Sequence, residues 1–448
     1  MGEHSGKHAH RGTRRGGAGS GLVSRRAIVG APAVIGAAAL VRSSAGPAQA
    51  VERALPRVRP LAAQVVHQGY GVCQHVNFQA TVYQHQAEVM ERYGQMAIAQ
   101  MRSMYAPNLS NFDAALAGAR KHSVKWNAIV GTMDTGRAEI ESKIAHMAAN
   151  NPEVIGSVEG VNEPNEGSGW VKPCIDRQRW IHNAVRSHPE LDHVQVLGPS
   201  MHDVRLQEAG GAHWKQLADA GVADFMDVCS VHNYPAASVP DAKRAERVQM
   251  VYDAFGDGYP IKFSEWGYTN SLGGTRRTRV GGARPISKEA AASYDCQAVL
   301  DFANHGWQVM RYEFLDDPDP SKRVTESNYG LWEVQSVAGN PDRTWTAKPA
   351  VKPLSAMLRA LRDPGKPYTT TPRRLRVDAP SDVRTCLTQK RDGSTTLWLW
   401  RHALTWDPKT EKALTPGTVT ARVERPRRTH TVQVGPMPVA VQIKGATT

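Results

Sequence analysis

The sequence predicts an α/β fold, a (β/α)8 TIM barrel followed by a small C-terminal β-sandwich-like domain. Three observations lead to this prediction. Short apolar segments recur at a steady interval from residue 65 onward, and segments with helical spacing of apolar residues lie between them. After residue 365 the apolar residues alternate with a period of two. Alternating strands and helices form parallel βαβ units, whereas period-two alternation is typical of antiparallel sheets.

The barrel prediction depends on eight strand segments in a row, because a (β/α)8 barrel needs eight parallel strands that are each followed by a helix. The predicted strands are 65–73, 96–101, 126–130, 155–161, 194–197, 225–231, 261–263 and 309–314. Helices are predicted over 111–121, 137–149, 287–304 and 348–361, where apolar residues return every three or four positions.

The C-terminal prediction depends on short alternating segments that are separated by turn signals such as Arg391-Asp392-Gly393. Strands are expected at 375–377, 385–389, 395–400 and 419–423, and the block 429–443 has the same pattern. We therefore interpret 366–448 as a small β domain that packs on the barrel, 65–362. The alternative is a tail of hairpins without a core of its own. Residues 51–64 would form a strap or an added strand.

The first fifty residues have the pattern of an export signal. Arg25 and Arg26 precede an apolar run of small residues, 27–41, and the Ala48-x-Ala50 pattern is one that signal peptidase accepts. The paired arginines resemble a twin-arginine signal, although the large apolar residue that usually follows them is here Ile28. We expect cleavage after Ala50 and a secreted, extracellular protein. An ordinary secretory signal or an uncleaved anchor is the alternative.

Composition and charge exclude several classes of protein. The chain has a formal net charge of +13, but residues 51–448 hold 48 Lys and Arg against 41 Asp and Glu, a net charge of +7. This mild excess suits an acidic surface or substrate and gives little support to nucleic-acid binding. No apolar run has the ~18 residues that a membrane-spanning helix needs. We expect a monomer without a stable membrane span and without a nucleic-acid partner.

The five cysteines are too few for a fold built on disulfides. Twin-arginine export carries folded proteins, so the thiols can stay free and shielded in the core. Cys73 and Cys229 lie in apolar strand segments, where a buried, inert thiol is expected. An odd number leaves at least one unpaired, and a bond between Cys174 and Cys296 stays open.

Two glutamates lie where predicted strands give way to loops. The fourth strand ends in Gly160-Val161-Asn162-Glu163-Pro164, and the seventh ends in Ser264-Glu265-Trp266-Gly267. Strands four and seven face each other across the mouth of an eight-stranded barrel, and barrel enzymes keep their chemistry at these strand ends. Paired carboxylates across a pocket are what cleavage of a glycosidic bond needs. The alternative is a loop acid at Glu163 and an ion-pair partner of Arg102 at Glu265.

With these two motifs the sequence resembles the glycoside hydrolases of clan A, over roughly residues 65–360. The resemblance implies Glu163 as general acid/base and Glu265 as nucleophile, with retention at the anomeric carbon. It also implies that Asn162 binds the sugar 2-hydroxyl. Glu159 and Glu166 flank the motif and are poorer candidates.

Three further positions agree with the resemblance. The sixth strand ends in His232-Asn233-Tyr234, where the clan has a tyrosine that touches the nucleophile and a histidine that shapes the sugar subsite. The second strand ends in Met101-Arg102-Ser103, where the clan often has an arginine beside the nucleophile. Arg102 would favour the ionised form of Glu265, and a less polar surround would raise the pKa of Glu163. His232 in a structural role is an equal alternative.

Aromatic residues after the strands are candidate walls of the sugar subsites, because flat rings bind the C–H faces of sugars. We expect Trp266, Trp170 and Trp332 in this role, with ordinary packing as the alternative. In the eighth strand, Phe314 stands where many clan members have a stacking Trp, or that ring is missing.

The loop 269–286 holds Arg276, Arg277, Arg279 and Arg284, which could meet acidic groups on a glycan; a solvated loop is the favoured alternative.

Asp316, Asp317 and Asp319 do not match a known calcium loop, so we predict no metal. Because no glycine-rich phosphate motif follows a strand, we predict no cofactor.

The function predicted from sequence is therefore that of a secreted retaining glycoside hydrolase that acts on a poly- or oligosaccharide. Two alternatives remain, an inactive carbohydrate-binding barrel and a transglycosylase that uses the same residues. The expected separation of the two carboxyl groups is ~5–5.5 Å for retention and ~6.5–9.5 Å for inversion.

Overall fold

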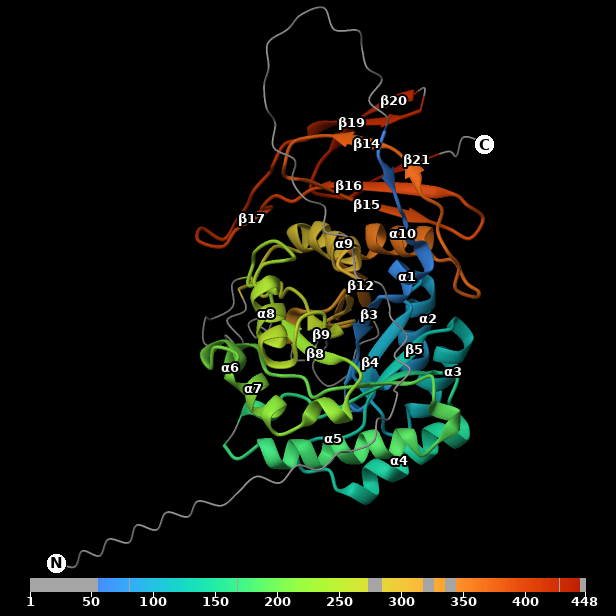
Figure 1. Cartoon of the computed structure of the whole chain (residues 1–448), viewed down its shortest axis with the longest axis vertical. Helices are drawn as coiled ribbons and strands as arrows, with labels where there is room; N and C mark the ends of the chain where they lie inside the picture. The colour runs from blue at the N-terminus through green and yellow to red at the C-terminus, as the bar shows by residue number, and fades with distance from the viewer. Residues whose placement is uncertain are drawn as a thin grey trace, which may run out of the picture. The chain divides into compact units, whose positions relative to one another are not determined.

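The computed structural model describes most of the chain from residue 55 to residue 443 (Figure 1). The predicted signal peptide lies outside the described residues, as do Arg276, Arg277, Arg279, Asp317 and Asp319. Among the helices that are described, none is long and apolar enough to cross a membrane. The described ranges are 55–79, 81–166, 168–272, 284–316, 326–334, 344–426 and 428–443.

Eight parallel strands form one nearly closed barrel, as the sequence predicts. Their order around the barrel is β7-β6-β5-β4-β3-β10-β9-β8, and Leu197 and Val228 bridge the remaining gap between β7 and β8. The order follows the chain around the ring, which is the topology that repeated βαβ units give. The strands are β3 (Tyr70–Cys73), β4 (Gln100–Met104), β5 (Lys125–Ile129), β6 (Ile155–Glu159), β7 (Gln195–Leu197), β8 (Cys229–Asn233), β9 (Ile261–Trp266) and β10 (Gln308–Arg311).

Helices cover the outside of this barrel and pair with their neighbours in the chain. All four helices predicted from sequence are present, with boundaries that differ by at most a few residues. The helices are α1 (Ala63–Gln68), α2 (Gln86–Met96), α3 (Phe112–His122), α4 (Arg137–Asn150), α5 (Val171–Arg186), α6 (Asp203–Glu208), α7 (Ala212–Asp219), α8 (Arg244–Phe255), α9 (Lys288–Asn304) and α10 (Val351–Leu361).

The first predicted strand, 65–73, was wrong in its first half. Residues 63–68 form α1, and only Tyr70–Cys73 enter the barrel as β3. The helix buries Ala63, Gln64 and Val66 and leaves Val65 63% exposed. The short apolar run therefore covers two elements, α1 and β3. An apolar run of this length does not distinguish a strand from a helix turn.

Two further sheets are formed mainly by the C-terminal part of the chain, and their strands are antiparallel except where β2 pairs with β15. One has the order β14-β19-β20 and the other the order β2-β15-β16-β21. Buried residues of both sheets form a separate hydrophobic cluster, which includes Leu375, Leu397, Val423 and Ile443. The strands are β2 (Leu61–Ala62), β14 (Arg376–Asp378), β15 (Val383–Gln389), β16 (Thr395–Arg401), β19 (Val419–Arg425), β20 (Arg428–Val434) and β21 (Val439–Ile443).

Strand β16 shows how one sequence serves two interfaces. Leu397 and Leu399 belong to the cluster between the two sheets, whereas Trp398 and Trp400 belong to the main core with the barrel helices. Successive side chains of a strand point to opposite faces, so the alternation of Leu and Trp gives each face its own partner. Figure 1 shows β15 and β16 beside α9, and the Asn304 side chain donates a hydrogen bond to the Thr385 carbonyl across this contact, at 2.9 Å.

The segment before α1 joins the C-terminal strands and not the barrel sheet. Strand β2 adds in parallel to β15, and β1 (Arg57–Val58) pairs with β13 (Arg373–Arg374). Two short hairpins complete the described strands, β11 (Trp332–Val334) with β12 (Trp345–Ala347), and β17 (Trp406–Asp407) with β18 (Lys412–Ala413).

Candidate active site

The two glutamates lie at the carboxyl ends of β6 and β9, on opposite sides of the barrel. Glu265 is the fifth residue of β9 and is 8% exposed. Glu163 follows β6 and has a φ of 49°, in the left-handed region that non-glycine residues rarely adopt. Its amide donates a hydrogen bond to the Ser200 carbonyl at 2.7 Å, which holds this backbone in place. Strained backbone of this kind is common at functional sites.

His232 brings the two carboxylates together. Its Nδ1 lies 2.9 Å from Oε1 of Glu163 and 3.4 Å from Oε2 of Glu265. One oxygen of each glutamate lies within 4.8 Å of the other. This separation is near the ~5–5.5 Å typical of retaining glycosidases and well short of the ~6.5–9.5 Å of inverting ones. His232 itself is completely buried at the end of β8.

Arg102 fixes the position of Glu265. Its Nη1 donates to Oε1 of Glu265 at 2.7 Å, and its Nε and Nη2 hold both oxygens of Glu159 at 2.8 Å. The same Nη2 donates to Oδ1 of Asn162 at 2.6 Å. Glu159 is fully buried on β6 and also accepts hydrogen bonds from Asn127 and Ser230. The buried guanidinium therefore has two carboxylates around it, and Glu159 holds the arginine in place for Glu265.

Tyr234 and Asn162 complete the polar contacts of this group. The Tyr234 hydroxyl donates to Oε2 of Glu265 at 2.6 Å, so that both oxygens of the carboxylate have donors. Asn162 accepts a second hydrogen bond from the Ser200 hydroxyl at 3.1 Å. The side-chain oxygen of Asn162 thus accepts from both Arg102 and Ser200. The amide nitrogen of Asn162 is therefore the atom that would meet a substrate hydroxyl.

The electrostatics of the pair of Glu163 and His232 differ from the sequence prediction. Burial raises the pKa of Glu163, but the His232 ring outweighs it and lowers the pKa of this carboxyl below its usual range. Burial also opposes the charge on His232, while Glu265 and Glu163 raise the pKa of the imidazole. The expected rise at Glu163 was therefore wrong, because the sequence did not show that His232 would donate a hydrogen bond to it.

An extra proton on this pair has two possible positions, Nε2 of His232 and the carboxyl of Glu163. Within the described part of the chain, Nε2 of His232 is buried and has no hydrogen-bond partner. A proton on that nitrogen would leave a buried donor unsatisfied, at a cost of ~1–3 kcal/mol. The alternative form keeps a neutral imidazole with Nδ1–H donating to Glu163 and places the extra proton on the glutamate. In that form Glu163 is ready to donate a proton.

A cavity of about 400 Å³ opens over these residues. Glu163, Glu265, Arg102, Asn162 and Tyr234 all line it, so the structure brings together the predicted acidic and polar residues, and His232 supports them from the core. Aromatic and polar residues form its other walls: His75, Asn77, Phe78, His202, Tyr312 and Tyr329.

Glu163, His232 and Glu265 are also the described residues with the spacing of a possible cation site. The surrounding donors do not fit a cation there. Arg102 and Tyr234 already donate to the two oxygens of Glu265, and a guanidinium next to a divalent cation would repel it. The arrangement instead fits a Glu265 carboxylate that is oriented by hydrogen bonds and available to react with a substrate.

Two of the three predicted tryptophan walls are wrong, and Phe314 does not line the cavity, which agrees with the alternative that the stacking ring of the eighth strand is missing. Trp266 is fully buried, and its indole N–H donates to the Pro240 carbonyl, because its side chain points away from the barrel interior. Trp332 is covered by the guanidinium of Arg92, which lies 4.3 Å from the ring centre. Phe314 is fully buried against Tyr93.

Trp170 occupies a different position. It is 7% exposed and lines a groove of about 630 Å³ that adjoins the cavity, since Glu163 lines both. Its ring packs edge-on against His213, with centroids 5.4 Å apart. The role that the sequence assigned to Trp170 is therefore possible only on this side of Glu163.

Sequence analysis missed the aromatic residues that do line the cavity. His75 and Phe78 follow β3, with parallel rings 4.2 Å apart, and Oε2 of Glu313 lies 2.5 Å from Nε2 of His75. Tyr312 follows β10 and packs edge-on against Tyr329, 5.4 Å away. Their position directly after a strand was a usable signal.

No protein-family model and no curated protein matches this sequence. Solved structures match it in fold. The α-L-arabinofuranosidase from Thermotoga maritima gives a TM-score of 0.50 at 10% identity, covering 88% of this chain and 96% of that one. An arabinofuranosidase from Xanthomonas axonopodis pv. citri gives 0.48 at 11% identity, over 88% and 94%. A β-1,3-glucanosyltransferase from Rhizomucor miehei gives 0.45 at 14%, over 63% and 99%. The likeness to the first of these proteins supports the barrel fold alone.

Proposed function

We propose that this protein is a retaining glycoside hydrolase that cleaves a poly- or oligosaccharide through Glu163 and Glu265. The observation that carries the proposal is the separation of the two carboxylates, whose oxygens lie within 4.8 Å across a cavity. A barrel fold hosts many reactions and does not choose one. The spacing and the different surroundings of the two acids are what select this chemistry.

In the first step, an oxygen of Glu265 attacks the anomeric carbon while Glu163 gives its proton to the departing glycosidic oxygen. The C–O bond to the leaving sugar breaks, and an ester bond to Glu265 forms. Arg102 and Tyr234 hold the carboxylate of Glu265 in one orientation through hydrogen bonds of 2.7 and 2.6 Å. A nucleophile held in this way loses little orientational freedom on reaching the transition state.

In the second step, the carboxylate of Glu163 takes a proton from water, and the water oxygen attacks the anomeric carbon. The ester to Glu265 breaks, and the sugar leaves with its original anomeric configuration. His232 would support both steps, because its Nδ1 lies 2.9 Å from Oε1 of Glu163 and can donate a hydrogen bond to that carboxyl. Asn162 would meet the 2-hydroxyl of the sugar through its amide nitrogen.

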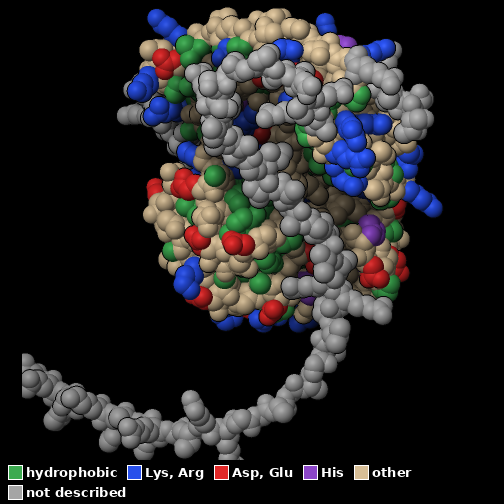
Figure 2. All heavy atoms as spheres, turned by 45° about the horizontal axis from the view of Figure 1, so that its top comes forward, with side chains coloured by type: hydrophobic (Ala, Val, Ile, Leu, Met, Phe, Trp, Pro, Cys, Tyr) green, Lys and Arg blue, Asp and Glu red, His purple; other side chains and the backbone are tan. Residues whose placement is uncertain are grey.

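The charge of the C-terminal part supports an acidic glycan as substrate. Residues 366–448 hold 15 Lys and Arg against 6 Asp and Glu, whereas residues 51–365 hold 33 against 35. On the face in Figure 2, Lys and Arg side chains gather over the upper part. Glu424 is shared by Arg376 and Arg422 at 3.5 and 3.8 Å. Such a basic surface would attract a polyanionic chain.

Export is part of the proposal, supported by Arg25-Arg26, the apolar run after them and the Ala48-x-Ala50 pattern. A protein released outside the cell would meet its glycan as a polymer, on the cell's own surface or on another. Detection of a mature chain that begins at Val51 in the culture medium, and its loss when both arginines are replaced by lysine, would test this part.

The decisive experiment measures sugar release from a broad panel of glycans by the wild type, Glu265→Gln and Glu163→Gln. The panel includes acidic and neutral polymers of bacterial and plant origin. We expect one class to be cut by the wild type, with both variants slowed by several orders of magnitude. Proton NMR of the first product should show the substrate's anomeric configuration.

The other outcomes separate the competing functions. An inverted product would contradict the assignment of Glu265 as nucleophile. New, longer oligosaccharides in the presence of acceptor sugar would make the protein a transglycosylase. If the wild type and Glu265→Gln bind a glycan equally well and neither cleaves it, the protein is a carbohydrate-binding protein.

A further inference from the structure

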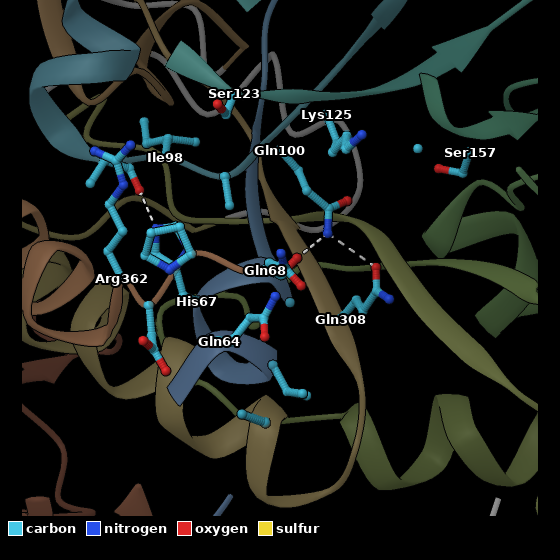
Figure 3. A pocket seen from close by; sticks show the side chains of 18 of the residues that line it. Gln64, His67, Gln68, Ile98, Gln100, Ser123, Lys125, Ser157, Gln308 and Arg362 are labelled. Atoms are coloured by element: carbon cyan, nitrogen blue, oxygen red, sulfur yellow. Dashed lines mark hydrogen bonds between the residues drawn. The ribbon is translucent and has the colours of Figure 1, made fainter. Parts of the chain in front are cut away.

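A second cavity lies at the opposite end of the barrel from the candidate active site. It has a volume of about 640 Å³ and is lined by residues from the amino ends of the strands, from α1 and from the segment after α10. We call it the floor pocket. In Figure 3 the Gln100 side chain reaches toward Gln68 and Gln308, with Lys125 and Ser157 beyond it. Its size falls within the ~300–1,000 Å³ of ordinary ligand pockets.

The buried wall of the floor pocket carries a positive charge. Lys262, the second residue of β9, lines the pocket and is only 2% exposed. Its ammonium donates to Oε1 of Gln100 at 2.8 Å and has a long contact of 3.5 Å to the Ser157 hydroxyl. An ammonium has three donors, so at least one remains for another partner. No carboxylate of the described residues forms an ion pair with Lys262.

Glu159 favours the charged form of Lys262 but forms no ion pair with it. Both oxygens of Glu159 are already held by Arg102. Burial, together with Arg102, lowers the pKa of Lys262 to about 8. A buried cation without a contacting anion is costly, and proteins normally pair such a group. The wall of the floor pocket therefore lacks one negative charge.

The remaining side chains of the pocket indicate what kind of anion fits. Five glutamine side chains line the same pocket, and one of them, Gln100, contacts the ammonium; they are Gln64, Gln68, Gln100, Gln195 and Gln308. Amides both donate and accept hydrogen bonds, which matches hydroxyl groups. A single ammonium matches a single carboxylate. The rim adds Lys125 and Arg362 against Asp363, so that the entrance also favours an anion.

From these contacts we infer that the floor pocket is a second ligand site, which binds a small hydroxylated carboxylate such as a free uronic acid through the ammonium of Lys262. A chain of contacts connects this site with the nucleophile. Lys262 touches Ser157, Ser157 donates to Asn127 at 3.0 Å, and Asn127 donates to Glu159, which holds Arg102. The inference does not depend on the proposed hydrolysis, because binding alone tests it.

Calorimetric titration of the full chain tests the inference, with glucuronate as the probe. Glucose serves as the neutral analogue and acetate as the anion without hydroxyls. Removing the charge with Lys262→Met should weaken glucuronate binding by roughly 10- to 100-fold, the value of one charge-assisted hydrogen bond. Gln195→Trp keeps the ammonium but fills the exposed side of the pocket, and should weaken binding to a similar extent. It also covers the case in which Lys262→Met fails to fold.

Tyr234→Phe is the control for binding in the other cavity, and it should leave glucuronate affinity unchanged. The inference is wrong if glucuronate does not bind the wild type, if both floor variants bind it as well as the wild type, or if Tyr234→Phe alone removes binding. Acetate or glucose binding as tightly as glucuronate would contradict the class of ligand. The inference is supported if acetate and glucose both bind more weakly than glucuronate and if Lys262→Met and Gln195→Trp lose glucuronate binding.

Discussion

Nδ1 of His232 lies 2.9 Å from Oε1 of Glu163, and this hydrogen bond joins a buried histidine to the candidate general acid/base. The imidazole has its pKa raised and the carboxyl has its pKa lowered, because each stabilises the charged form of the other. The titration of either group therefore belongs to the pair, and the two do not behave as independent acids.

The first prediction concerns the pH dependence of kcat/KM. Activity requires the extra proton on the pair, so the rate should fall as the pH rises through the raised pKa of His232, above about 6.5. In His232→Gln the proton resides on Glu163 alone, and the alkaline limb should move down by roughly two pH units, the difference between ordinary histidine and glutamate. His193→Gln, at an exposed histidine elsewhere in the barrel, is the control. An unmoved limb would show that His232 has no part in the titration.

The second prediction concerns Arg102, which is 4% exposed and bonded to Glu159 and Glu265. Arg102→Met would leave two buried carboxylates without their cation. Breaking a buried ion pair on one side typically costs ~3–5 kcal/mol, so the free energy of unfolding in urea should fall by about that amount. Lys215→Met is the matched control, since Lys215 and Asp219 form an exposed pair that is worth at most ~1 kcal/mol. Equal effects of the two substitutions would contradict this account.

The third prediction concerns the contact between the barrel and the C-terminal sheets. Asp241 accepts from Arg384 at 2.7 Å and from His402 at 2.8 Å, and these partners outweigh burial and lower its pKa. The stabilisation is complete above the unfolded-state pKa of ~4 and is lost as the pH falls toward the lower folded-state value. The urea midpoint should therefore fall below pH ~4, and Asp241→Asn should reduce that dependence. Asp219→Asn, at a solvated helix pair, should keep the wild-type pH profile.

The fourth prediction concerns the five cysteines, which are all free and buried. Burial raises the pKa of Cys174 and Cys386 to about 12, and it raises the pKa of the other three thiols as well. Thiolates are the reactive form, so a thiol reagent at neutral pH should label none of the five in the native protein and all five in urea. The possible bond between Cys174 and Cys296 does not form. Rapid labelling without denaturant would contradict the buried positions.

Much of the fold was predictable because the local periodicity of apolar residues indicates which segments are strands and which are helices. The alternation of short apolar segments with helical segments fixed the class of fold, and the period-two pattern of 395–400 predicted β16 with its two faces. The segment 65–68 was not predictable in the same way. Four residues do not show a period, and only the pairing of β3 with β4 and β10 decides where the strand begins.

The sequence by itself determined that Glu163 and Glu265 lie where strands give way to loops, the end of a barrel at which enzymes of this fold keep their chemistry. Only the tertiary structure decided which groups those acids meet. Trp266 adjoins Glu265 in the chain, yet the pleat turns it into the core, while Tyr312 and Phe78 reach the cavity from distant strands. The lowered pKa of Glu163 likewise comes from His232, 69 residues away. Contacts of this kind depend on the closure of the barrel, which no local pattern encodes.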